Sequence, residues 1–233
     1  ALYVPVYVAK RKLIHIIKIL KISNCNAVVI DMKDDNGNLF FPTKNKTAQL
    51  IRSIRRPANV KKILQTFHKH KIYVIARIVV FKDRRMFLGF KQKYAIRNWR
   101  TGLPWRGTKH EYWVDPHSKV VQNYNIAIAK DLEKLGFDEV QFDYIRFPSD
   151  GPVYLCSFPF KKNKRMYKSE ILADFLKKAN EQLEIPISTD IYGFNSWYHF
   201  GNWIGQDMHE FSKHVDVICP MVYPSHFGHR WYM

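Results

Sequence analysis

Residues 141–148 have the sequence Gln-Phe-Asp-Tyr-Ile-Arg-Phe-Pro, which puts an acidic residue at the end of an apolar, strand-like run. A helical stretch closed by Gly136 precedes them and a Pro-Ser-Asp-Gly turn follows, the order found in a β/α unit. Because side chains alternate across a strand, we expect Gln141 and Asp143 on one face and Tyr144 on the other. Reactive groups lie at the carboxyl ends of barrel strands, so Asp143 is the first candidate for chemistry.

Short apolar runs alternate with amphipathic helical stretches along the chain. Such runs are typical of a parallel sheet covered on both faces. The expected strands are, in chain order, 4–9, 27–33, 72–81, 139–147, 185–192 and 215–223. Six units in a row favour an α/β (β/α)8 TIM-type barrel over a doubly wound sheet. We therefore predict one domain over residues 1–233, an incomplete barrel with about six β/α units that is truncated or naturally shortened after the sixth strand.

The composition limits the classes of partner. A net charge of +18 favours a polyanionic partner in general. The lysines, however, are spread over several predicted helices without a motif that reads DNA or RNA, so we expect no nucleic acid and assign most of the charge to solvated helix faces. The three cysteines lack metal-ligand spacing and no glycine-rich phosphate loop is present, so we expect no metal and no cofactor. No apolar run approaches the roughly 20 residues that cross a bilayer.

One long connection is expected to lie over the carboxyl-end face of the barrel. Residues 83–116 separate the third predicted strand from the next helix and contain Trp99, Trp105 and Trp113. Loops of this length in a compact domain are usually functional. The tryptophans would either stack on sugar rings or form a satellite core beneath the loop.

Six blocks of sequence carry a family resemblance: 26–37 (NAVVIDMKDDNG), 75–82 (IARIVVFK), 113–116 (WVDP), 123–130 (NYNIAIAK), 136–151 (GFDEVQFDYIRFPSDG) and 220–226 (PMVYPSH). In this order, and over nearly the whole chain, they resemble the "putative glycosyl hydrolase" family of TIM-barrel proteins, long catalogued as a domain of unknown function. The resemblance implies a bacterial, often exported protein whose partner is a carbohydrate.

A more distant similarity is to chitinase-type barrels, whose fourth strand carries Asp-x-x-Asp-x-Asp-x-Glu and whose sixth carries Met-x-Tyr-Asp. In this chain Ile145 stands at the position of the acid-donating Glu, and Pro224 stands at the Asp of the second motif. These departures argue against a mechanism that uses the acetamido group of the substrate. The expected barrel and the position of its sugar site are unaffected.

Glycoside hydrolysis generally needs two carboxyl groups, one protonated and one ionised. Asp143 is one candidate, and Asp190 at the end of the fifth predicted strand is the expected second. A separation of about 5 Å between them would suit a retaining enzyme, and one of roughly 6.5–9.5 Å an inverting enzyme. The other residues expected to bind substrate are Asp31, Lys33, Arg77, Trp105, Trp113, Gln141, Arg146 and Tyr223.

Structural roles remain alternatives for several of these residues. Asp31 and Asp34 are rival carboxylates, although an ion pair of Asp31 with Lys33 or Arg77 is the stronger reading. Asp143 can likewise be a buried partner of Arg77, and Tyr223 a packed core side chain. The sequence thus favours a glycoside hydrolase acting on a polysaccharide or cell-envelope glycan, with a non-catalytic glycan-binding barrel as the alternative, because a fold does not establish an activity.

Overall fold

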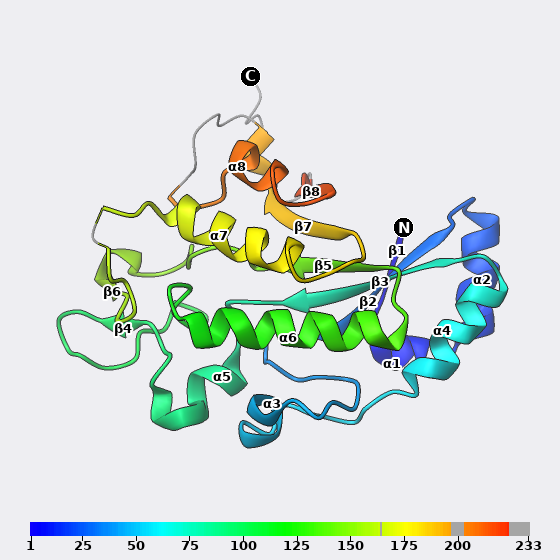
Figure 1. Ribbon diagram of the computed structural model, residues 1–233, viewed down its shortest axis with the longest axis horizontal. Helices are drawn as coiled ribbons and strands as arrows, with labels where there is room; N and C mark the ends of the chain where they lie inside the picture. Colours follow the sequence, from blue (N-terminus) through cyan, green and yellow to red (C-terminus); the bar gives the residue numbers. More distant parts are fainter. Residues whose placement is uncertain (164, 197–202, 224–233) are drawn as a thin grey trace.

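A computed structural model describes residues 1–163, 165–196 and 203–223, and it is built around one sheet of six parallel strands. The strands pair in the order β1-β2-β3-β5-β7-β8. Their bounds are β1 (Leu2–Val4), β2 (Ala27–Lys33), β3 (Tyr73–Val79), β5 (Glu139–Asp143), β7 (Ile187–Tyr192) and β8 (Val217–Met221). The sheet curls into a half-barrel with helices between its strands (Figure 1), which confirms the predicted incomplete α/β barrel.

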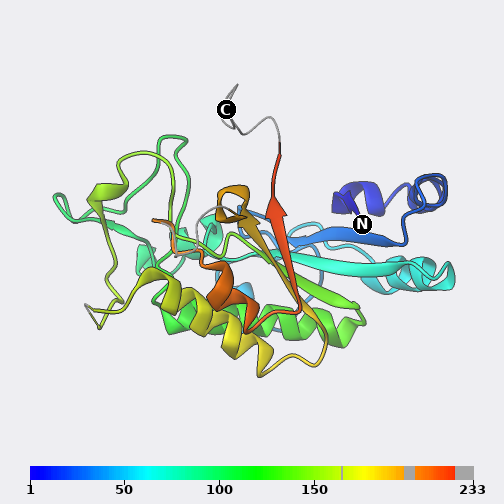
Figure 2. The same ribbon diagram turned by 90° about the horizontal axis from the view of Figure 1, so that it is seen from above.

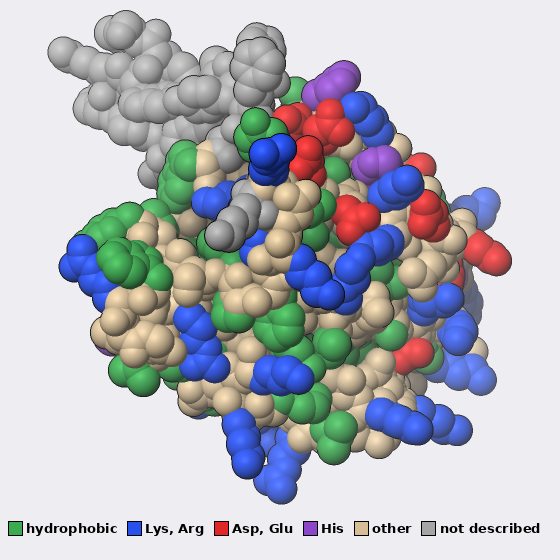
Figure 3. Space-filling view, turned by 60° about the vertical axis from the view of Figure 1, so that its left-hand side comes forward, with side chains coloured by type: hydrophobic (Ala, Val, Ile, Leu, Met, Phe, Trp, Pro, Cys, Tyr) green, Lys and Arg blue, Asp and Glu red, His purple; other side chains and the backbone are tan. Residues whose placement is uncertain are grey.

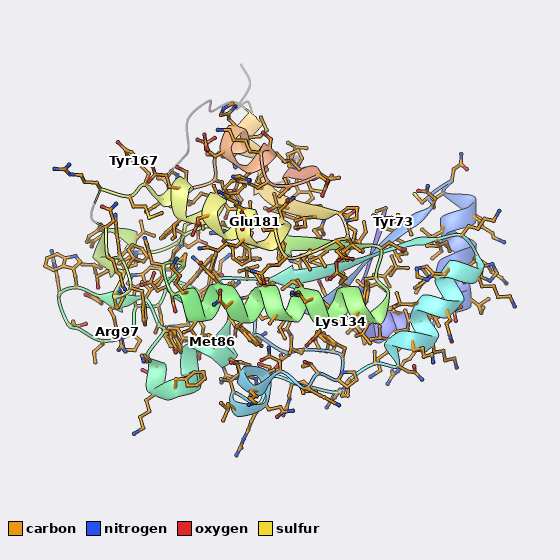
Figure 4. All side chains as sticks on the ribbon, viewed as in Figure 1. Tyr73, Met86, Arg97, Lys134, Tyr167 and Glu181 are labelled. Carbon is orange, nitrogen blue, oxygen red and sulfur yellow. The ribbon has the colours of Figure 1, made fainter. Side chains whose placement is uncertain are left out.

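Helices connect the strands and cover the sheet. They are α1 (Val6–Ala9), α2 (Leu13–Ile22), α3 (Lys46–Leu50), α4 (Val60–Lys69), α5 (Arg84–Leu88), α6 (Lys119–Leu135), α7 (Lys168–Asn180) and α8 (Met208–Ser212). Figure 2 shows α6 and α7 side by side beneath the sheet. Side chains fill the space between these helices and the strands, with Lys134 near the end of α6 and Glu181 just after α7 (Figure 4).

The longest helix, α6, has a clear start and stop in the sequence. The Ser118 side chain accepts a hydrogen bond from the amide of Val121, as N-cap residues do. Gly136 follows the last turn with a φ of 95°, the left-handed conformation that ends many helices. Strand β5 begins three residues later and is buried along its whole length. The helix stop thus fixes where the central strand starts.

Some predicted bounds are wrong for local reasons. The first strand ends at Val4, because Pro5 precedes helix α1 rather than continuing the strand. The fourth predicted strand ends at Asp143, because Tyr144 has a left-handed φ of 55°. The second strand has the predicted bounds, 27–33.

The long connection 83–116 has structure of its own. It contains α5, a 3-10 turn η1 (Gly89–Gln92) and strand β4 (Arg97–Asn98), which pairs antiparallel with β6 (Cys156–Ser157). Its aromatic rings pack together: Phe87 meets Tyr112 edge-on with ring centroids 5.1 Å apart. Trp105 and Trp113 of this connection are buried in the same core cluster as the strands, whereas Trp99 is 58% exposed. Two of the three tryptophans therefore pack within the protein, but in the main core and not in a separate one.

Candidate active site

A cleft of about 740 Å³ opens where β5, β7 and β8 end. Asp143, Tyr192 and Met221, the last residues of these strands, all line it. Six of the residues predicted to form the site line this cleft: Arg77, Gln141, Asp143, Arg146, Asp190 and Tyr223. The cleft thus lies at the carboxyl-end face of the half-barrel, where barrel enzymes carry their active sites.

Arg77 is the centre of the charged groups in this cleft. It lies on β3 between Asp31 of β2 and Gln141 of β5 in the strand register. Its Nη1 donates to Asp31 Oδ1 at 2.5 Å, and its Nε donates to Asp143 Oδ2 at 3.1 Å. The same Nε lies 3.9 Å from Asp190 Oδ2. Burial alone would lower the pKa of Arg77, but Asp143 and Asp31 outweigh it and raise this pKa.

Asp143 accepts hydrogen bonds from three donors. Nε and Nη2 of Arg77 both donate to its Oδ2. The backbone amide of Tyr144 donates to its Oδ1 at 2.6 Å. These three hydrogen bonds fix the position of the side chain. The predicted alternative, an ion pair between Asp143 and Arg77, is therefore present in the cleft.

The environment of Asp190 differs from that of Asp143, because it raises the pKa of the carboxyl group. Its side chain is only 13% exposed, and burial followed by the charge of Asp143 raises its pKa to about 8, against the opposing effect of Arg77. A hydrogen bond with Asp143 contributes in the same direction. The cleft therefore contains, beside the Asp143 side chain that Arg77 holds, an acid whose raised pKa favours the protonated form at neutral pH.

Arg146 and Tyr144 form the wall of the cleft beside these acids. The Arg146 guanidinium lies over the rings of Trp113, Tyr144 and Tyr192, at 4.8, 5.0 and 4.7 Å from their centroids. Its Nη1 donates to the carbonyl of Phe147 at 3.2 Å. The side chain is buried, so its cationic group is positioned by packing and not by solvent.

Sequence reasoning missed several lining residues. Tyr144 was expected on the face opposite Asp143, but its left-handed backbone turns it into the cleft. Tyr3 lies on β1, and its hydroxyl group donates a hydrogen bond to Asp31. Glu111 enters from the long connection and pairs with Lys82 at 2.7 Å. The only available signal for Tyr3 and Tyr144 was their position near strand ends, which many other residues share, and Glu111 lies in the long connection without such a signal.

Three predicted substrate-binding residues lie outside the cleft. Lys33 is fully buried, pairs with Asp83 at 2.7 Å and donates to the carbonyl of Val79 at 2.5 Å. It is therefore not the partner of Asp31, which is Arg77. Trp105 is buried and donates to the carbonyl of Pro152 at 3.1 Å, and Trp113 is buried beneath Arg146. These positions correct the expectation that the three side chains meet a sugar directly.

The remaining predicted residues, Gln141 and Tyr223, also line the cleft. Gln141 donates to Cys219 Sγ at 3.5 Å and lines the floor beside Asp143. Tyr223 is 51% exposed and lines the rim, so it is not a packed core side chain.

Among the described residues, no group of three or more His, Cys, Asp and Glu is arranged to hold a metal ion. No described helix is long and apolar enough to cross a membrane.

The family described as "Putative glycosyl hydrolase domain" matches residues 1–233. The chain belongs to this family. It is also similar to the crystal structure of a hypothetical protein from Ruminiclostridium thermocellum ATCC 27405, with 35% identity and a TM-score of 0.73 over 82% of this chain and 97% of that one. A search of curated proteins finds no significant match.

More distant structures share the fold alone. The PgaB (BpsB) glycoside hydrolase domain from Bordetella bronchiseptica has 14% identity and a TM-score of 0.69, over 94% of this chain and 73% of that one. Alpha-L-fucosidase isoenzyme 2 from Paenibacillus thiaminolyticus has 12% identity and a TM-score of 0.55, over 76% of this chain and 29% of that one. These structures therefore support the barrel fold of this chain.

Proposed function

We propose that the protein hydrolyses glycosidic bonds of a polysaccharide or cell-envelope glycan, with Asp190 as the proton donor and Asp143 as the ionised carboxylate. The observation that carries this proposal is the contrast between the environments of the two neighbouring acids: burial and the charge of Asp143 raise the pKa of Asp190 to about 8, whereas the Asp143 side chain accepts three hydrogen bonds from Arg77 and the Tyr144 amide. Pairs of titratable groups with opposed environments are the mark of acid and base roles.

In the proposed mechanism, Asp190 gives its proton to the glycosidic oxygen as the bond to the leaving sugar breaks. Asp143 attacks or stabilises the anomeric carbon from the position that Arg77 fixes. Arg77 Nε lies 3.1 Å from Asp143 Oδ2 and 3.9 Å from Asp190 Oδ2, so both carboxyls face one guanidinium. We assign the retaining mechanism to this pair: Asp143 forms a covalent glycosyl intermediate, and the ionised Asp190 then takes a proton from the water molecule that hydrolyses it.

Aromatic side chains around the acids supply the surface for a sugar ring. Tyr144 and Tyr192 lie beside Arg146, and Tyr223 stands on the rim. Gln141 and Arg146 add hydrogen-bond donors for sugar hydroxyls. A pocket with flat apolar faces and a few directed polar groups suits a carbohydrate.

The test is hydrolysis of a glycan panel by the purified protein and by Asp143→Asn and Asp190→Asn. General acid–base catalysis contributes about 10²–10⁴-fold, so each variant should lose at least about 100-fold in kcat while still binding glycan. Asp31→Asn is the matched control, because Asp31 also pairs with Arg77 in this cleft but has no part in the proposed pair. The assignment fails if Asp143→Asn keeps the wild-type rate, or if Asp31→Asn alone abolishes turnover.

A glycan-binding barrel without catalysis is the second candidate. Both oxygens of Asp143 already accept hydrogen bonds, as expected of a structural carboxylate. Under this alternative the protein binds a glycan of the panel, releases no product from it, and binds equally well after Asp143→Asn. Product release measured in the same experiment separates the two functions.

A further inference from the structure

A second hollow, of about 710 Å³, lies between the turn that joins α1 to α2 and the first turns of α4. The cationic and titratable side chains that line it are Lys10, Arg11, Lys12, His15 and Lys62. Among the described residues that line it, none is Asp or Glu. Lys10 Nζ donates to the carbonyl oxygen of Arg56 at 3.1 Å, which ties the α1–α2 turn to the segment before α4. The hollow is thus a groove between the α1–α2 turn and α4, and both of its sides carry positively charged side chains.

The part of the chain that forms this groove is poor in carboxylates. Residues 1–82 contain 17 Lys and Arg but only three acidic residues, so they carry +14 of the net +18. The three acids are Asp31, Asp34 and Asp35, at or just after the end of β2. Asp31 pairs with Arg77, and Asp35 with Lys82. None of the ion pairs found among the described residues includes a cation of the groove.

Two helix N-termini add to the positive potential. The N-cap of α2 is Lys12, whose side chain makes no capping hydrogen bond, and the first turn contains no acidic residue. The first turn of α4 also lacks an acid, and its N-cap Asn59 lines the groove. Helix N-termini present amide donors and partial positive charge, and both features favour an anion.

We propose that this groove binds a phosphate or sulfate group. Lysine and arginine side chains give charge-assisted hydrogen bonds to such oxyanions, and the helix ends complement them. The group would come either from a soluble phosphorylated or sulfated molecule or from the headgroups of an anionic lipid surface. The second source is considered because Ile14 and Tyr7, on the two helices that flank the turn, are 60% and 66% exposed. This binding is separate from the proposed glycan cleft.

The experiment titrates the whole chain with inorganic phosphate and with sulfate at constant ionic strength, by calorimetry or by amide chemical shifts. The test variant is Arg11→Gln/Lys62→Gln. The matched control is Lys18→Gln/Lys21→Gln, which removes two charges from exposed positions of α2 outside the groove. We expect saturable binding that weakens at least about tenfold in the test variant and stays within about twofold in the control. Chemical shifts should move in the first turns of α2 and α4.

Sedimentation with phosphatidylglycerol and phosphatidylcholine vesicles then identifies the source. Binding to phosphatidylglycerol that inorganic phosphate displaces assigns the site to lipid headgroups, and phosphate binding without vesicle binding assigns it to a soluble ligand. Equal weakening in the test and control variants would show general charge attraction and overturn the proposal. Absence of saturable binding to phosphate, sulfate and both vesicles would overturn it as well.

Discussion

Arg77 links three carboxyl groups of the proposed active site. Its guanidinium forms short ion pairs with Asp31 and Asp143, whereas its Nε lies 3.9 Å from Asp190 Oδ2. Burial and then the charge of Asp143 raise the pKa of Asp190, and the weaker opposing effect of Arg77 does not cancel them. Burial and neighbouring charge thus give Asp190 an environment that differs from that of Asp143.

The raised pKa of Asp190 predicts a pH dependence of stability. Because the folded-state pKa is about 8 and the ordinary value is 3.8, the folded protein binds more protons than the unfolded chain between these values. The contribution of this group to stability is fully present below about pH 4 and is lost as the pH rises through about 8. Thermal melts of wild type and Asp190→Asn from pH 5 to pH 9 should show a fall in Tm in wild type that is smaller in the variant.

Asp174→Asn is the control for this measurement, because Asp174 is a partly exposed surface residue on α7 that pairs with Lys178. It should keep the wild-type dependence. Parallel curves for wild type and Asp190→Asn would contradict the raised pKa. The same group should also limit activity on the alkaline side, with hydrolysis declining through about pH 8 as the proton donor ionises.

Strand alternation predicted which side chains of the central strands meet in the cleft. Gln141 and Asp143 both line it, with Arg77 opposite Gln141 in the strand register and Asp190 in the lining of the same cleft. Alternation fails at Tyr144, because the strand ends there and the backbone turns left-handed. The sequence could not predict these turns, since they depend on bonds formed outside the strand.

Burial of charged side chains was equally hard to predict. Lys33 lies at a strand end like the residues that line the cleft, but it is buried and pairs with Asp83, 50 positions along the chain. Trp105 and Trp113 have the residue type of a sugar platform, yet their indole N–H groups find partners at Pro152 and Glu111 within the protein. Only the three-dimensional contacts distinguish these cases from binding residues.

At the scale of elements, α6 is the helix whose ends are best defined by sequence. Its length of 17 residues, its N-cap Ser118 and its terminal Gly136 all follow from local preferences. The short elements of the long connection could not be predicted in this way, because each is stabilised by partners far away in the sequence. Strand β4, for example, has two residues and pairs with Cys156 and Ser157.

We predict that Gly136→Ala destabilises the protein through its backbone conformation. The φ of Gly136 is 95°, and an added Cβ would meet only Leu64 Cδ1 at 3.9 Å, an ordinary contact. The cost is therefore conformational, about 1–2 kcal/mol. Urea unfolding measures it as a lower midpoint with an unchanged slope. Lys134→Ala, in the last turn of the same helix, should change stability by no more than about 0.5 kcal/mol. Equal effects of the two substitutions would refute the explanation.

At the scale of the whole molecule, charge is distributed unevenly along the chain. Residues 1–82 carry most of the positive excess, whereas the acids are concentrated after them. Figure 3 shows Lys and Arg side chains spread over much of one face and acidic side chains gathered mainly in its upper part. Among the described residues, few of these exposed cations form ion pairs. The folded state therefore contains self-repulsion that solvent and salt must screen.

This repulsion predicts that added salt stabilises the protein. Raising NaCl from about 10 mM to about 150 mM shortens the screening length from about 30 Å to about 8 Å, so repulsion between exposed lysines weakens and Tm should rise. A variant with Lys18, Lys21, Lys61 and Lys69 changed to Gln should start from a higher Tm at low salt and gain less from NaCl, since all four side chains are exposed. Sodium phosphate at the same ionic strength should raise the wild-type Tm further than NaCl if the groove between α2 and α4 binds the anion, because binding to the folded state adds stability beyond screening. A wild-type Tm that stays flat or falls with NaCl would show that these charges do not oppose folding.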